Sequence, residues 1–139
     1  MDSGHNLQRF IDAQENVYSV ALGEVKRGRK QNHWMWFIFP QIQGLGFSPT
    51  SKLYAIKDTS EAKIFLHQPL LSRRLIEISN ELLQLESNDA HAIFGSPDDM
   101  KLQSSMTLFS SVHDANPVFN LVLKKFFNGI KDMNTLRRL

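Results

Sequence analysis

The sequence predicts a mostly α-helical, compact single domain over residues 1–139, with about six helices, short connections and little or no sheet. Two observations support this fold class. Apolar residues recur at three- and four-residue spacing through most of the chain, as they do on one face of a helix. Residues that start or stop helices also stand at the boundaries of these apolar segments.

The first helix is expected from Leu7 to Arg27, with Asn6 as its cap and Gly28 in the left-handed conformation after its end. Gln14 is a polar member of the otherwise apolar face. The other members of that face are Leu7, Phe10, Ile11, Val17, Tyr18, Ala21, Leu22 and Val25.

The middle of the chain is harder to assign. Segment 34–39 is short and continuously apolar, so it fits either a buried helical turn or a short strand. Segment 41–49 contains two glycines and a proline and is expected to be a loop. Segment 52–58 again fits either a short strand or one helical turn.

The remaining segments are expected to be helical, each with its own boundary signal. A helix capped by Thr59 or Ser60 ends before Pro69, which suits the first turn of the next helix, ending near Leu85. Asp89 is the expected cap of a short helix that Gly95 stops.

Three further helices complete the prediction. Ser96 is the expected cap of a helix to about residue 112, and Asn116 the cap of one that Gly129 ends. A last short helix covers residues 132–139, with Leu136 and Leu139 pointing inward.

The net charge and the cysteine and histidine content exclude several classes of function. A formal charge of +2 is too small to imply a nucleic-acid partner. The absence of cysteine excludes disulfides, thiolate nucleophiles and zinc sites of the Cys type. The five histidines lack metal-ligand spacing, so neither a metal nor a cofactor is expected.

The N-terminus does not resemble a signal peptide, and the longest apolar run, 34–40, is far shorter than the roughly 20 residues of a membrane helix. No membrane partner is expected, and the cytoplasm is the simplest location.

The candidate site lies around the stretch Lys30–Ser48, KQNHWMWFIFPQIQGLGFS, which holds both tryptophans beside a basic run. Aromatic faces stack on flat rings, basic groups hold anions, and a histidine can act as a base or donate to phosphate. Glutamine amides can read an amide or base edge. The candidate ligand-binding residues are Gln14, Arg29, Lys30, His33, Trp34, Trp36 and Gln41.

Each candidate also has a structural interpretation. A tryptophan can belong to the core with its indole N–H satisfied, and in a helical turn Trp34 and Trp36 would diverge. His33 can order a loop, and Gln14 can tie its helix to the aromatic stretch. The glycines of segment 44–48 can cradle an anion with backbone amides, although no known nucleotide-loop pattern is present.

Ser104, Ser105 and Thr107 place three hydroxyls on one helix. No G-x-S-x-G elbow surrounds them and no base is adjacent in sequence. They are therefore expected to be small residues at a helix crossing, together with hydroxyls that face solvent.

Long runs of this sequence resemble one bacterial family, called domain of unknown function 1810, whose members are sometimes labelled calpastatin. The runs are 10–14, 28–30, HWMWFIFPQ at 33–41, 44–46, 54–56, 67–69, 74–75, 93–95 and DMKLQSSMTLF at 99–109. The resemblance implies a small helical domain with no established activity. The calpastatin label finds no support in the composition, which is that of a folded chain.

A weaker resemblance is to the NADAR family, whose members process ADP-ribose derivatives. It rests on Ala13-Gln14, Glu61-Ala62, Met106 and Lys125-Phe126, and the hallmark loops of that family are absent.

The leading functional hypothesis, based on the basic and aromatic residues of the candidate site, is a helical binding domain for a small, planar, anionic, nucleotide-like ligand. The alternatives are a hydrolase of ADP-ribose or NAD derivatives and a protein-interaction module.

Overall fold

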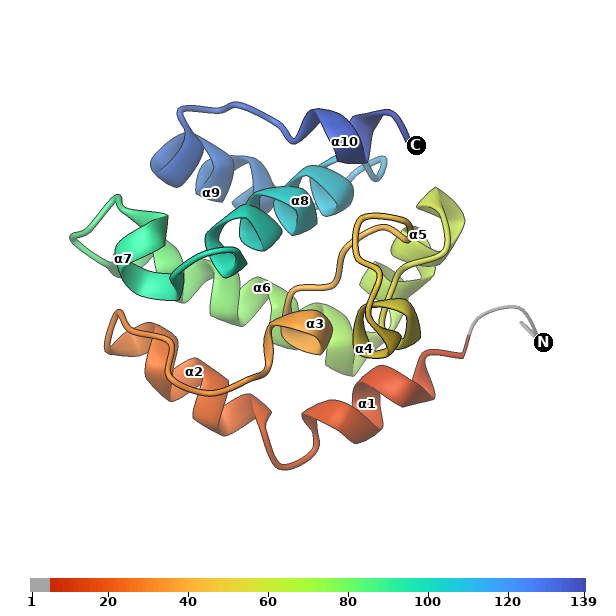
Figure 1. Ribbon diagram of the computed structural model, residues 1–139, viewed down its shortest axis with the longest axis horizontal. Helices are drawn as coiled ribbons and strands as arrows, with labels where there is room; N and C mark the ends of the chain where they lie inside the picture. Colours follow the sequence, from red (N-terminus) through yellow and green to blue (C-terminus); the bar gives the residue numbers. More distant parts are fainter. Residues whose placement is uncertain (1–5) are drawn as a thin grey trace.

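The structure, a computed structural model, describes residues 6–139. Over this range the chain forms ten helices and no strand, which confirms the mostly helical class. The number of helices is larger than predicted, because six helices of seven or more residues are joined by four shorter ones (Figure 1). In order they are α1 Gln8–Gln14, α2 Tyr18–Lys26, α3 Met35–Ile38, α4 Pro49–Leu53, α5 Thr59–His67, α6 Pro69–Gln84, α7 Ala90–Phe94, α8 Asp98–Ser110, α9 Val118–Phe127 and α10 Met133–Leu136.

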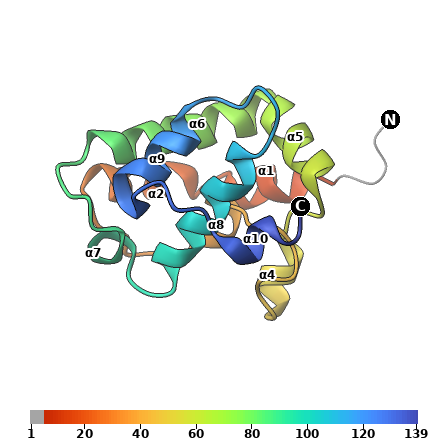
Figure 2. The ribbon, with the colours of Figure 1, turned by 90° about the horizontal axis from the view of Figure 1, so that it is seen from above.

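Helix α8 lies at the centre of the fold. It packs against α5, α7, α9 and α10, and in Figure 1 the helices α9 and α10 lie above it and α6 below. Because neighbours surround it, the hydroxyl-bearing residues Ser104, Ser105 and Thr107 are all buried. The prediction that some of these hydroxyls face solvent is wrong for this reason. Figure 2 shows the same central position from above.

The single helix predicted from Leu7 to Arg27 is two helices, α1 and α2, separated by a turn at residues 15–17. The apolar face continues through the turn, but α1 packs mainly on α3 whereas α2 packs on α6. A straight helix of this length would extend about 30 Å and could not follow both neighbours. Asn6 does not cap α1, since Leu7 stands at the N-cap position without a side-chain hydrogen bond.

The other boundaries agree with the prediction in part. Pro69 begins α6, and Asp89 caps α7 through a 3.2 Å bond from the N–H of Ala92. Asp58, rather than Thr59 or Ser60, caps α5, because its carboxylate accepts the N–H of Glu61 at 2.9 Å.

The starts of α8 and α9 differ slightly from the prediction. Pro97 occupies the N-cap position of α8 and no side chain caps it, so Ser96 is not the cap. Asn116 accepts the N–H of Val118 at 2.9 Å, although Pro117 is the N-cap residue of α9.

Each of the two ambiguous middle segments contains helical residues. Segment 34–39 contains the short helix α3, and segment 52–58 contains the end of α4 followed by a single parallel bridge from Ile56 to Ile42. The loop predicted over 41–49 is present as far as Ser48, but Pro49 already begins α4.

A buried carboxylate holds the entrance to α3. Glu24 on α2 is 1% exposed, and its Oε1 accepts the N–H of Gln31 at 2.7 Å, the N–H of Asn32 at 3.0 Å and the indole N–H of Trp34 at 2.9 Å. The side-chain amide of Asn32 donates to its other oxygen. Burial raises the pKa of Glu24, but these hydrogen bonds outweigh burial and lower it to about 2.

A second polar cluster attaches α10 to α8. Asp132 caps α10 by accepting the N–H of Thr135 at 3.1 Å and its hydroxyl at 2.6 Å, and the Ser104 hydroxyl lies 3.0 Å from the same oxygen. The N–H of Asp132 donates to the Thr107 hydroxyl at 2.9 Å.

Thr135 is consequently the inward residue of α10. Leu136 and Leu139 are 37% and 44% exposed, so the prediction that they point inward is wrong. The orientation of α10 is therefore determined by the hydrogen bonds among these hydroxyls and the Asp132 carboxylate, rather than by apolar contacts.

We expect Glu24→Gln to be less stable than the wild type at pH 7. A shift of the pKa from 4.5 to about 2 corresponds to about 3 kcal/mol of stabilisation. Because the folded-state pKa is depressed, this stabilisation is complete above pH 4.5 and disappears as the pH falls toward 2. Urea unfolding between pH 7 and pH 2 measures the difference, which should shrink on acidification. The exposed Glu86→Gln is the control, and a difference that stays constant with pH would contradict the assignment.

We expect Asp132→Ala to destabilise the protein by about 1–2 kcal/mol, because a helix cap and the bond to Ser104 are lost together. Urea unfolding at pH 7 measures the effect. Lys131→Ala, an exposed neighbour, should stay within about 0.5 kcal/mol of the wild type. Equal stability of the two variants would show that the cluster does not hold α10.

Candidate functional site

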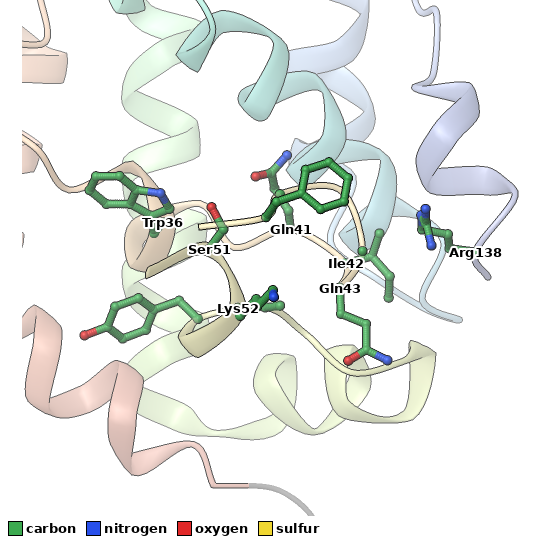
Figure 3. A pocket seen from close by; sticks show the side chains of 12 residues that line it. Trp36, Gln41, Ile42, Gln43, Ser51, Lys52 and Arg138 are labelled. Carbon is green, nitrogen blue, oxygen red and sulfur yellow. The ribbon is translucent and has the colours of Figure 1, made fainter. Parts of the chain in front are cut away.

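A pocket of about 550 Å³ lies between the loop at 41–47, α4 and the C-terminal end of the chain (Figure 3). Its volume falls within the range of ligand sites. It is lined by Trp36, Gln41, Ile42, Gln43, Gly44, Gly46, Phe47, Ser51, Lys52, Tyr54, Ala55 and Arg138.

The pocket loop is held by the bridge between Ile42, which lines the pocket, and Ile56, and both residues are buried. The N–H of Gln43 donates to the carbonyl of Ile56 at 2.8 Å, and the N–H of Ile56 donates to the carbonyl of Gln41 at 2.8 Å. This pair of bonds holds the loop beside the segment that follows α4.

Arg9 supports the same segment from behind. Its Nε donates to the carbonyl of Leu53 at 2.8 Å, and its Nη2 donates to the carbonyl of Ala55 at 2.9 Å. Nη2 also pairs with buried Glu61 at 3.2 Å, whose carboxylate accepts the N–H of Lys57 at 2.9 Å. The Arg9–Glu61 pair thus positions the pocket wall without lining the pocket.

Two glycines permit close approaches across the loop. A Cβ on Gly44 would lie 2.4 Å from Nη1 of Arg138, and Gly44 has a φ of +95°. A Cβ on Gly46 would lie 2.6 Å from Cβ of Ser51. A side chain at either position would therefore displace a neighbour that lines the pocket.

The lining combines aromatic rings with cations. Trp36, Phe47 and Tyr54 supply rings, and Phe47 is 83% exposed. Lys101 on α8 lies 5.1 Å from the centre of the Trp36 ring. Lys52 and Arg138 supply positive charge, and neither forms an ion pair with any carboxylate of residues 6–139.

Two of the sequence-predicted ligand residues, Trp36 and Gln41, line this pocket. Trp34 is completely buried and belongs to the core, with its indole bound to Glu24. The two tryptophans diverge, as a helical turn predicts. Arg29 and His33 are exposed and do not line the pocket.

Lys30 and Gln14 have structural partners instead. The Lys30 ammonium lies 2.9 Å from the Asp98 carboxylate and 5.0 Å from the Trp34 ring centre, and its side chain is only 8% exposed. Gln14 donates to the carbonyl of Phe37 at 2.8 Å. It also accepts from Arg74 at 3.3 Å, so it ties α1 to α3 and α6.

Sequence reasoning missed most of the polar lining. Gln43, Ser51, Lys52 and Arg138 carried no motif, and Arg138 reaches the pocket only because α10 folds back onto α8. The glycine-containing segment 44–48 was the one signal that pointed to this loop as an anion site.

Among residues 6–139, no three His, Asp or Glu side chains gather closely enough to hold a metal ion. None of the helices described by the structure combines the length and apolar character needed to cross a membrane.

The chain is similar to proteins without an assigned function. A crystal structure of the conserved hypothetical protein Rv1873 from Mycobacterium tuberculosis has 44% sequence identity to it and a TM-score of 0.93, covering 96% of this chain and 95% of that one. No curated protein matches the chain. Residues 4–139 match the family described as "Protein of unknown function (DUF1810)". These matches extend over nearly the whole sequence, and the chain belongs to the DUF1810 family.

Proposed function

We propose that the pocket between the 41–47 loop and α4 binds a small, planar, anionic ligand of the nucleotide type. The observation that carries the proposal is that an accessible tryptophan and two cations without carboxylate partners in residues 6–139 line one cavity of about 550 Å³.

Trp36 supplies the platform for a planar ring. Its partner Trp34 fills the core, whereas Trp36 is half-buried and lines the pocket. Stacking of one base on an aromatic side chain contributes roughly 1–3 kcal/mol and tolerates different bases. Phe47, in the same lining, offers a second apolar surface.

Lys52 and Arg138 supply the charge complementarity. An arginine fork matches carboxylate and phosphate geometry, and a lysine adds a mobile positive charge. The amides of Gln41 and Gln43 and the hydroxyl of Ser51 can donate and accept along the same wall. The lining therefore resembles small-molecule sites, which combine apolar walls with a few polar groups.

The lining favours binding over hydrolysis. Its twelve residues include no Asp, Glu or His, and the groups there that could move a proton are Lys52 and Tyr54. Glu61, which the hydrolase hypothesis would use, is held by Arg9 and the N–H of Lys57. Asp99 lies 3.4 Å from His91 on the α7–α8 side.

We expect ligands of this class to quench Trp36 fluorescence in a saturable titration. The panel is nucleoside monophosphates, the planar carboxylates nicotinate and orotate, the neutral nucleosides, and glycerol phosphate as a non-planar anion. In Trp36→Phe the remaining tryptophan is buried Trp34, so the optical response should disappear while calorimetry still detects binding.

Trp36→Leu should weaken binding by about tenfold in calorimetry, because the stacking surface is lost. Leu121→Ala, an exposed apolar position on α9, is the control and should bind like the wild type. A panel in which no planar anion binds, or in which glycerol phosphate binds as tightly as the planar anions, would refute the proposal.

A further inference from the structure

The pocket has two chemically different ends. In Figure 3, Trp36 and Arg138 stand at opposite ends of the labelled side chains, with Gln41 and Ser51 between them. The Trp36 end offers an aromatic face, and the Arg138 end offers a guanidinium group. A ligand with a ring at one end and an anionic group at the other would match this polarity.

The Arg138 end also has free hydrogen-bond donors. The backbone N–H groups of Gly44, Gly46 and Phe47, three residues of the lining, donate to no acceptor within residues 6–139. The Arg138 guanidinium approaches Gly44 so closely that a Cβ there would meet Nη1 at 2.4 Å. A positive fork beside backbone amides of the same loop suits a phosphate group, which presents several acceptor oxygens.

The fold brings Arg138, rather than its neighbour, to this loop. The N–H of Arg138 donates to the carbonyl of Thr135 at 2.9 Å, which continues the turn of α10 beyond its last residue. Asp132 attaches that helix to Ser104 and Thr107 of α8. Arg137 lies instead near Asn134, at 3.5 Å, and does not line the pocket.

We propose that the pocket selects a phosphate monoester of a nucleoside, bound in one orientation with its base on Trp36 and its phosphate against Arg138 and the 44–47 loop. The inference rests on the proposed function and adds the chemical class and the polarity of the ligand. Such a phosphate carries a charge of about −1.5 to −2 at pH 7, since its second pKa is about 6. Lys52 and Arg138 together balance that charge.

Calorimetry with matched pairs tests the inference. The probes are adenosine, guanosine, cytidine and uridine, the monophosphate of each, and inorganic phosphate. We expect the best monophosphate to bind at least about tenfold more tightly than its own nucleoside. Inorganic phosphate should bind more weakly than the monophosphate, because it lacks the ring that stacks on Trp36.

Charge-removing variants locate the phosphate. Arg138→Gln should abolish most of the advantage of the monophosphate and leave nucleoside binding unchanged. Arg137→Gln removes the same charge one residue earlier and should behave like the wild type. Lys52→Gln should weaken the monophosphate to a smaller degree, and Lys63→Gln, an exposed lysine outside the lining, should have no effect.

The outcomes separate this inference from the proposed function. If nicotinate or orotate binds at the Trp36 site but monophosphates do not, the planar-anion function stands and the phosphate inference fails. If Arg137→Gln and Arg138→Gln lower monophosphate affinity equally, the charge acts only at long range and the assigned orientation is wrong. If no planar anion binds, the proposed function itself fails.

Discussion

The arrangement of the pocket depends on one buried charge, the carboxylate of Glu24. A buried carboxylate is tolerated only when hydrogen bonds replace its hydration, and here the donors come from Gln31, Asn32 and Trp34. These bonds fix the chain immediately before α3. Because α3 is helical, fixing Trp34 in the core turns Trp36 toward the surface. The Glu24 carboxylate thereby holds Trp34 in the core and leaves Trp36 accessible.

Helix boundaries that depend on a few adjacent residues could be predicted from the sequence. Features that depend on contacts with residues distant in the sequence could not. Pro69 and Asp89 mark their helices correctly because their effect on the first turn is local. The break between α1 and α2 leaves the apolar period unchanged, so it follows only from packing against α3 and α6. Leu136 faces outward because the partners of Asp132 lie on α8, far away in sequence.

The same distinction explains the site. Trp36 and Gln41 were identified from the aromatic stretch, and both line the pocket. Lys30 carried the same basic signal, but Asp98 neutralises it across the fold. Lys52 and Arg138 looked like ordinary surface cations in the sequence. In the structure both line the same pocket, and neither forms an ion pair with a carboxylate of residues 6–139. Only the three-dimensional arrangement determines this.

Helix α8 connects the two ends of the pocket. At one end Lys101 lies over the Trp36 ring, and at the other Ser104 and Thr107 hold Asp132, which caps α10, the helix that Arg138 follows. Both contacts arise within two turns of α8, so this helix touches the aromatic end of the pocket and also holds the segment that brings Arg138 to the cationic end. The buried hydroxyls of Ser104 and Thr107, which the sequence placed partly toward solvent, therefore attach α10 to α8 beside the pocket. The small side chains of Ser104 and Thr107 let α10 approach α8 closely, which brings Arg138 to the pocket.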